Sequence, residues 1–256
     1  MSILAIIPAR MNSSRFPGKP LKKISGMPMI EHCYRRAKLV SEIDEVYVAT
    51  CDKEINDYIL SINGKSVLTS ELHNRATSRT AEALEIIEST NKKKYDVVIM
   101  IQGDEPLISP ESLRKLTDKS IYLSADIANI MCLIESDKVF EDKNNVKVVV
   151  DKNFNAMYFS REPIPCNWGL IQDIPRYMQT GIISFKRESL KKFNLSDETI
   201  LEKAESVDMN RVIENGIKIR MIPSDQFSLG VDVEEELILA EQLMKKDHYF
   251  SKYLVE

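Results

Sequence analysis

Short, uninterrupted runs of apolar residues recur through the first half of the chain. They occupy residues 2–7, 46–49 and 97–101. A continuous apolar run of this length is typical of a strand that is buried on both faces, as in a parallel sheet. Each run leads through a polar loop to a helical pattern, as at residues 29–39 and 81–87. This alternation predicts an α/β fold, a doubly wound, Rossmann-like and mostly parallel sheet with helices on both faces.

The middle of the chain departs from this alternation. Residues 146–150 and 156–159 have the pattern of two strands joined by a turn, and an irregular, proline-rich stretch follows them. The elements expected after that stretch are a helix at residues 202–215, a strand at residues 217–222 and a helix at residues 234–246. No repeat, low-complexity tract or linker separates these segments, so we expect a single domain over residues 1–256.

Composition narrows the class of protein. The 256 residues are 43% apolar and 29% charged, which is typical of a packed globular chain. The formal net charge is −4, and Lys and Arg are scattered among the acidic residues, so nucleic acid is not an expected partner. The apolar run near the start is too short for a membrane span or a signal segment. We therefore expect a cytoplasmic protein without membrane insertion.

Cysteine and histidine offer little material for a metal site or a nucleophile. The cysteines are widely spaced, with no C-x-x-C pair, and the histidines are equally dispersed. These residues are Cys33, Cys51, Cys132, Cys166, His32, His73 and His248. Structural zinc, a disulfide framework and a Ser-His-Asp triad are not expected, and any metal should be a hard cation bound by oxygen.

The loop after the first predicted strand carries three cations. Ligands of doubly wound sheets bind at the carboxyl ends of the strands, where this loop places Arg10, Arg15 and Lys19. Small residues such as Ser13 and Gly18 would let backbone amides approach phosphate oxygens, and guanidinium groups suit such oxygens. The loop matches neither the Walker nor the dinucleotide-binding pattern. It predicts a polyphosphate site, and the alternative is a solvated basic loop.

Two aspartates occupy comparable positions at predicted strand ends. Asp104 follows the run at residues 97–101, and Asp232 directly precedes the final predicted helix. Two carboxylates would repel a triphosphate unless a divalent cation lay between them, which points to Mg²⁺ as the cofactor. The alternatives are a turn residue for Asp104 and a helix N-cap for Asp232. Glu105 is a weaker metal candidate that could brace the loop.

Four motifs span nearly the whole chain. They are IIPAR at residues 6–10 with Ser13, Arg15 and PGKPL at 17–21; QGDEPLI at 102–108; NVKV at 145–148 with YFSR at 158–161 and PIP at 163–165; and GVD at 230–232. In these motifs and their order the chain resembles the CMP-Kdo synthetases, the 3-deoxy-manno-octulosonate (Kdo) cytidylyltransferases. The resemblance implies the fold of nucleotide-diphospho-sugar transferases.

The resemblance also implies a reaction and the residues that carry it. The anomeric hydroxyl of an acidic sugar attacks the α-phosphorus of CTP and expels pyrophosphate, for surface polysaccharide or lipopolysaccharide precursor synthesis. The catalytic residues would be Arg10, Lys19, Asp104 and Asp232, the last two as Mg²⁺ ligands. The nucleotide-binding residues would be Pro8, Ala9, Arg10, Ser13, Arg15, Lys19, Asn74, Arg75, Gln102 and Asp104. The substrate-binding residues would be Arg79, Gln102, Arg161, Gln179, Asp208 and Met209.

The chain departs from the family pattern in three places. Around Arg75 and Ser78 it lacks the family's small hydroxyl, glycine and acidic residues, and Arg79 could pair with Glu82 instead of substrate. Where the family carries Arg-His-x-Gly-x-Tyr this chain has MQTGII at residues 178–183, and Asp208-Met209 replaces a Glu-Gln pair. Because hydrogen-bonding sites discriminate strongly, the acceptor could be Kdo, an amino-substituted relative or another acidic molecule. Met209 could equally be a core residue.

Two other functions stay open on the sequence. One is a nucleotidyltransferase of the same fold that uses a sugar phosphate and another NTP. The other is a catalytically silent nucleotide-binding protein. The resemblance further implies a homodimer, with an insertion around residues 160–195 as the contact; the alternative for this segment is a plain surface loop.

Overall fold

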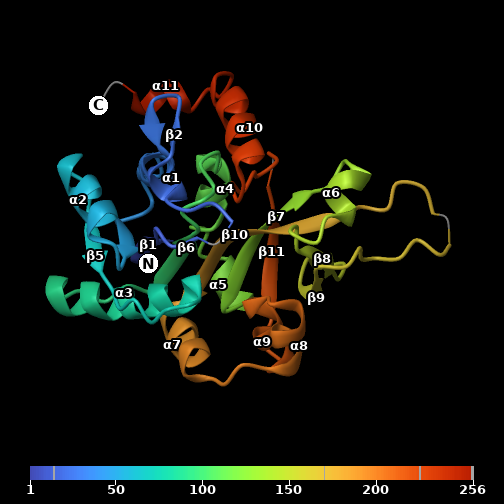
Figure 1. Cartoon of the computed structure of the whole chain (residues 1–256). Coiled ribbons are helices and arrows are strands. Elements are labelled where there is room, and N and C mark those ends of the chain that lie inside the picture. Colours follow the sequence, from blue (N-terminus) through green and yellow to red (C-terminus); the bar gives the residue numbers. More distant parts are fainter. Residues whose placement is uncertain (14, 170, 225, 255–256) are drawn as a thin grey trace. The chain divides into compact units, whose positions relative to one another are not determined.

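The computed structural model describes residues 1–13, 15–169, 171–224 and 226–254. These residues form two compact units, which are Met1–Thr117 with Ser228–Glu256, and Asp118–Phe227 (Figure 1). Unit 1 is therefore discontinuous in sequence. No change of composition marks either boundary, and the expectation of one domain over residues 1–256 stays a prediction.

Unit 1 is built on a parallel sheet with the strand order β6-β1-β4-β5. Its strands are β1 (Ile3–Ala9), β4 (Glu45–Thr50), β5 (Ser66–Leu68) and β6 (Val97–Ile101). All residues of β1 and β6 are buried, and Ile6 lies opposite Tyr47 on one side and Met100 on the other. The predicted parallel strands, buried on both faces, are confirmed here. All four carboxyl ends lie at one edge, because the strands run in the same direction.

Helices cover both faces of this sheet. They are α1 (Met29–Lys38), α2 (Lys53–Ser61), α3 (Ala76–Asn91), α4 (Pro110–Lys115), α10 (Glu234–Met244) and α11 (Phe250–Tyr253). Figure 1 shows α1 and α4 on one side of β1 and β6, and α3 on the other. Helix α1 buries Ile30, Cys33 and Ala37, which share one face at a helical period. Within the described ranges no helix is both long and apolar enough to cross a membrane.

Unit 2 has a mixed sheet. Its strands are β7 (Ile127–Leu133), β8 (Lys147–Val150), β9 (Ala156–Ser160), β10 (Tyr177–Lys186) and β11 (Ile219–Pro223). Strand β11 runs parallel to β7, while β10 is antiparallel to both β7 and β8, and β8 and β9 form an antiparallel pair. The predicted strand pair at residues 146–150 and 156–159 is confirmed. The strand β10 was not predicted.

The helices of unit 2 include a break that the sequence analysis missed. They are α5 (Ile121–Ser124), α6 (Asp137–Glu141), α7 (Arg187–Leu195), α8 (Ile200–Glu205) and α9 (Asp208–Glu214). The prediction of one helix over residues 202–215 is wrong, because Ser206 adopts a left-handed conformation with φ 53° and ends α8. The Arg161 side chain donates to the carbonyl oxygens of Glu205 and Ser206, which satisfies backbone acceptors at this break.

Candidate active site

The loop after β1 folds back on itself around one carbonyl group. The backbone oxygen of Met11 accepts hydrogen bonds from the amides of Ser13 (3.0 Å) and Gly18 (2.9 Å). Gly18 has φ +71°, a conformation that side chains other than glycine's rarely adopt. It immediately precedes the short 3-10 helix η1 (Lys19–Leu21). The loop geometry therefore fixes the point from which the Lys19 side chain leaves the backbone.

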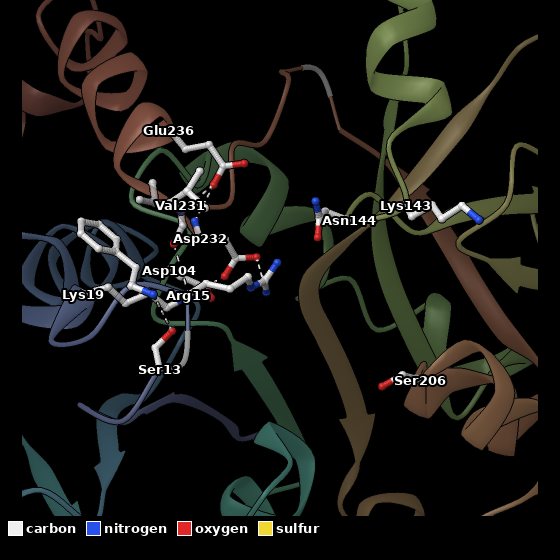
Figure 2. Close-up of polar contacts among 12 residues, drawn as sticks. Ser13, Arg15, Lys19, Asp104, Lys143, Asn144, Ser206, Val231, Asp232 and Glu236 are labelled. Atoms are coloured by element: carbon white, nitrogen blue, oxygen red, sulfur yellow. Dashed lines mark hydrogen bonds and ion pairs between the residues drawn. The ribbon is translucent and has the colours of Figure 1, made fainter.

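Lys19 joins the two predicted metal ligands (Figure 2). Its Nζ donates to Asp104 Oδ2 at 2.7 Å, to Asp232 Oδ1 at 2.8 Å and to the Val231 carbonyl oxygen at 3.2 Å. The side chain is only 13% exposed, so these ion pairs are shielded from solvent. The two carboxylate oxygens lie at most about 5.5 Å apart, which is the sum of their distances to the shared nitrogen.

The surroundings of Lys19 keep it protonated. Burial by itself lowers the pKa of the ammonium group, but the charges of Asp104 and Asp232 and the hydrogen bonds to them raise it. The net effect is a pKa above the ordinary value for lysine. Lys19 is therefore a permanent positive charge at this edge of the sheet, a property suited to binding phosphate oxygens.

Asp104 owes its position to a close backbone approach. It follows β6, and the preceding residue Gly103 leaves no room for a side chain, because a Cβ there would lie 3.2 Å from the Pro8 carbonyl oxygen and 2.8 Å from Ile30 Cδ1. The Asp104 carbonyl oxygen accepts the Val231 amide at 2.9 Å. Glycine thus lets the loop after β6 pack against the end of β1, beside the segment that carries Asp232.

Asp232 does not cap the final helix. The N-cap of α10 is Val233, and Glu236 Oε2 accepts the backbone amides of Asp232 (2.5 Å) and Val233 (3.1 Å). The alternative of a helix N-cap for Asp232 is therefore wrong. Its carboxylate points away from the helix, where Oδ2 lies 2.7 Å from Arg15 Nη2 and Oδ1 binds Lys19. Glu105, the residue after Asp104, accepts a hydrogen bond from Ser228 Oγ at 2.5 Å. It thereby braces the segment that leads to Asp232.

The donor set fits a magnesium ion that is shared with a phosphate ligand. Two carboxylates already converge on one cationic group, and carboxylate oxygens are the ligands that Mg²⁺ prefers. Among the described residues no group of three or more His, Cys, Asp and Glu side chains could hold a metal by itself. Asp104 and Asp232 would therefore provide part of a coordination shell, with phosphate and water oxygens as the remainder.

The segment before α3 is organised by its own side chains. Arg79 is 2% exposed and donates to Thr69 Oγ1 (2.6 Å) and to the carbonyl oxygens of Ser70 and His73. These contacts make Arg79 a brace of the loop and take the place of the alternative pairing with Glu82, while the predicted substrate contact of Arg79 stays a prediction. Glu82 instead lies 2.6 Å from His73 Nε2.

The other predicted nucleotide residues lie around the same edge of unit 1. Pro8 and Ala9 are buried at the end of β1, Arg10 and Asn74 are exposed, and Ser13, Arg75 and Gln102 are half-buried. The exposed cation of Arg10 follows directly on β1. The structure thus places cations and small polar groups at the carboxyl ends of the strands, and the binding roles of these residues stay predictions.

The predicted sugar-binding residues Arg161, Gln179, Asp208 and Met209 belong to unit 2. Met209 has no exposed surface, so it is a core residue and its predicted substrate contact is not supported. Arg161 Nε, Nη1 and Nη2 each donate to a backbone carbonyl oxygen. Asp208 begins α9 and is half-buried. Gln179 is different, because its buried Oε1 has no hydrogen-bond partner among the described residues.

The sequence analysis missed three residues that help to order the candidate site. Glu236 orders the Asp232 segment, His73 pairs with Glu82, and Asp52 accepts the Met11 amide at 2.8 Å. Only Glu236 had a local signal, an acidic residue three positions after a helix start. The Met11 amide that Asp52 accepts lies 41 residues away, so no local pattern reveals this contact.

Comparison with known proteins shows which family the chain resembles along its length. A family model described as Cytidylyltransferase matches residues 4–219. A 3-deoxy-manno-octulosonate cytidylyltransferase of Thermodesulfovibrio yellowstonii is 39% identical, over 95% of this chain and 98% of the relative. An 8-amino-3,8-dideoxy-manno-octulosonate cytidylyltransferase of Shewanella pealeana is 37% identical, over 96% of this chain and 100% of the relative.

A solved structure is also similar over nearly the whole chain. It is that of CMP:2-keto-3-deoxy-manno-octonic acid synthetase complexed with CTP, with a TM-score of 0.85 and 33% sequence identity. The match covers 96% of this chain and 99% of the solved one.

Proposed function

Because the chain belongs to the CMP-Kdo synthetase family of cytidylyltransferases, we propose that it transfers CMP from CTP to a 3-deoxy-2-keto sugar acid and releases pyrophosphate. The observation that carries this proposal is the convergence of Lys19, Asp104 and Asp232 at the carboxyl end of the parallel sheet. This arrangement combines a fixed positive charge with paired hard oxygen ligands, which is what a metal-bound triphosphate requires.

The cationic and the acidic side chains have different roles in this proposal. Arg10, Arg15 and Lys19 bind phosphate oxygens, and Lys19 stabilises the charge that develops on the departing pyrophosphate. Asp104 and Asp232 hold Mg²⁺, which when bound neutralises phosphate charge and lowers the pKa of the attacking hydroxyl. Nucleotide binding has to part Lys19 and Arg15 from the carboxylates that they contact in the structure. Little side-chain acid–base chemistry is required, because the lowered pKa would let the attacking hydroxyl pass its proton to solvent as the bond to the α-phosphorus forms.

Two acceptors are supported by the relatives, and we place Kdo first. The Kdo enzyme of T. yellowstonii is 39% identical and the 8-amino enzyme of S. pealeana 37%, so similarity does not separate them. The unpartnered Gln179 Oε1 favours an acceptor that offers a hydrogen-bond donor, since a buried acceptor without a donor is costly. A hydroxyl and an ammonium group both meet that requirement. The amino-substituted sugar acid is the second candidate.

The proposal extends to the protein's setting. The enzyme acts as a homodimer in the cytoplasm, and its CMP-sugar feeds surface polysaccharide or lipopolysaccharide synthesis. The dimer contact is the segment around residues 160–195, which exposes Trp168 (92%) and Ile171 (64%).

The test is a matrix of nucleotides and acceptors. The purified chain is incubated with Mg²⁺, each of CTP, UTP, ATP and GTP, and each of Kdo, 8-amino-3,8-dideoxy-octulosonate and a sugar phosphate. Pyrophosphate release and the mass of the nucleotide sugar are followed. Product with CTP and Kdo alone supports the first candidate. Product with another NTP and the sugar phosphate would point to the rival transferase, and no product in any well would favour the silent nucleotide-binding protein.

A further inference from the structure

Asp52 is an N-cap residue whose carboxylate does not cap its helix. It lies between β4 and α2 with an extended backbone, and its side chain makes no hydrogen bond to the first turn of α2. Aspartate at this position usually accepts one of the helix's first amides and stabilises it by about 1 kcal/mol. The Asp52 side chain does not make this capping hydrogen bond.

The carboxylate reaches the first loop instead. Asp52 Oδ2 accepts the backbone amide of Met11 at 2.8 Å, and the Cys51 thiol lies 3.6 Å from the same oxygen. A hydrogen bond from an amide to an ionised carboxylate is stronger than one between neutral groups. The bond ties the loop after β1 to the end of the neighbouring strand β4.

Met11 connects the Asp52 carboxylate to the candidate site. Its carbonyl oxygen accepts the amides of Ser13 and Gly18, and Gly18 precedes Lys19, whose amine binds both carboxylates of the site. Hydrogen bonds thus connect Asp52 to Met11 and Met11 to Gly18, and Gly18 is joined to the backbone of Lys19 by a peptide bond. Within the described part of the chain the Asp52 carboxylate contacts the Met11 amide and the Cys51 thiol but not Lys19, Asp104 or Asp232, so it acts through the loop.

We propose that Asp52 is a positioning residue of the nucleotide site, which holds the first loop through the Met11 amide so that Lys19 and the loop's arginines meet the triphosphate. The proposal rests on the proposed function for the identity of the ligand. Small displacements of such groups are costly, because binding and transfer both depend on their placement.

Substitutions of Asp52 separate anchoring from helix capping. Asp52→Ser supplies a short side chain that caps a helix as well as aspartate does but cannot reach Met11. Asp52→Asn keeps an acceptor of the same length without the charge. The matched control is Asp44→Ala, since Asp44 Oδ2 accepts the Ile3 amide at 2.6 Å, at the opposite end of β1. This control loses an equivalent bond far from the first loop.

Two measurements are made on each variant. Hydrogen–deuterium exchange of the segment 11–19 reports on the loop directly, and calorimetric titration with CTP and Mg²⁺ reports on the ligand. We expect Asp52→Ser to exchange faster in that segment, to bind CTP about tenfold more weakly and to keep the wild-type melting temperature. Asp52→Asn should recover most of the affinity, and Asp44→Ala should match the wild type in both measurements.

The outcomes separate this proposal from the proposed function. Wild-type exchange and affinity in Asp52→Ser would overturn the proposal, as would faster exchange spread over all of unit 1 with a lower melting temperature. If the wild type itself binds no CTP, the proposed function fails. The exchange of residues 11–19 then still decides whether Asp52 anchors the loop.

Discussion

The Lys19 side chain links the two aspartates of the candidate site. Its ammonium group lies between Asp104 and Asp232, the residues that the proposed function assigns to Mg²⁺. Such a cluster neutralises its own charge, so neither carboxylate is left buried without a counter-ion. In the proposed function the two aspartates also hold Mg²⁺, so their loss should affect turnover more than folding.

Replacing either carboxylate tests this directly. We expect Asp104→Asn and Asp232→Asn to lower kcat by roughly 100-fold or more, since each removes charge and a metal ligand from the site. Steady-state kinetics over a range of Mg²⁺ concentrations measure the effect. Asp57→Asn, on the exposed surface of α2, is the control and should behave as the wild type. An unchanged kcat in a folded Asp104→Asn protein would contradict the assignment.

His32 makes the stability of the fold depend on pH. Burial lowers its pKa from 6.5 to about 4, while Nδ1 lies 2.8 Å from the Tyr253 hydroxyl and Nε2 2.8 Å from the Ile24 carbonyl oxygen. The nearby charges of Arg36 and Glu31 have smaller, opposing effects on the pKa. The folded state therefore favours neutral His32. Its contribution is complete above the unfolded pKa and is lost as pH falls from 6.5 towards 4.

The protonation of His32 should change the free energy of unfolding by a measurable amount. Between about pH 7.5 and about pH 5 the free energy of unfolding should fall by about 2 kcal/mol on account of His32. Urea unfolding at the two pH values measures it. His32→Gln cannot titrate, so its stability should change by that much less over the same interval. Equal pH dependence in both proteins would contradict this, because it would show that His32 has the same pKa in the folded and the unfolded state.

The strands β1, β4 and β6 and the helices α1, α3 and α10 of unit 1 could be predicted, because each has a local pattern in the sequence, whereas the short strand β5 and the helices α2, α4 and α11 were not predicted. The strands β1 and β6 are buried on both faces, so every residue in them is apolar or small, and the loops after them carry the charges. Unit 2 was harder. Strand β10 contains Gln179, Thr180 and Gly181, which read as loop residues, and its identity depends on pairing with β7 about 50 residues away.

The candidate site shows the same division. The cations of the first loop and the pair Asp104 and Asp232 were visible from their places at strand ends. The contacts that order them, from Asp52 to Met11 and from Glu236 to the Asp232 amide, join separate loops or depend on a helix boundary. The helix break at Ser206 was missed because its acceptors are satisfied by Arg161, which is distant in sequence.

The helices of unit 2 are joined by one buried ion pair. Arg211 in α9 binds both carboxylate oxygens of Glu202 in α8 at 2.6 Å, and its Nη1 donates to Phe193 and Ser196 carbonyl oxygens near the end of α7. Glu202 is completely buried. Removing one partner leaves the other charge buried without compensation, which is strongly destabilising.

We therefore expect Glu202→Gln to lower the free energy of unfolding by about 3 kcal/mol. Urea denaturation followed by circular dichroism measures the loss. The control is Glu162→Gln, which removes an ion pair between Lys143 and Glu162 whose side chains are both more than 60% exposed. Such a surface pair contributes about 0–1 kcal/mol. Equal losses in the two variants would contradict a special role for the buried pair.

For the molecule as a whole, the proposed homodimer depends on the proline-rich segment of unit 2. A largely exposed tryptophan and isoleucine are expected to be covered in a stable assembly. We expect Trp168→Glu to shift the mass measured by light scattering from dimer to monomer at micromolar concentration. Leu123→Glu is the control, since Leu123 is a similarly exposed apolar residue (89%) in α5, outside residues 160–195. A wild-type monomer would contradict the proposed dimer.

Unit 1 is interrupted in sequence by unit 2, so its site is completed late in synthesis. Lys19 and Asp104 leave the ribosome early, but Asp232 and Glu236 belong to the segment that follows residue 227. A nascent chain that ends before this segment has Lys19 but only one of the two carboxylates that Lys19 binds. The order of translation therefore delays the assembly of the Lys19, Asp104 and Asp232 cluster until the segment after residue 227 has been made.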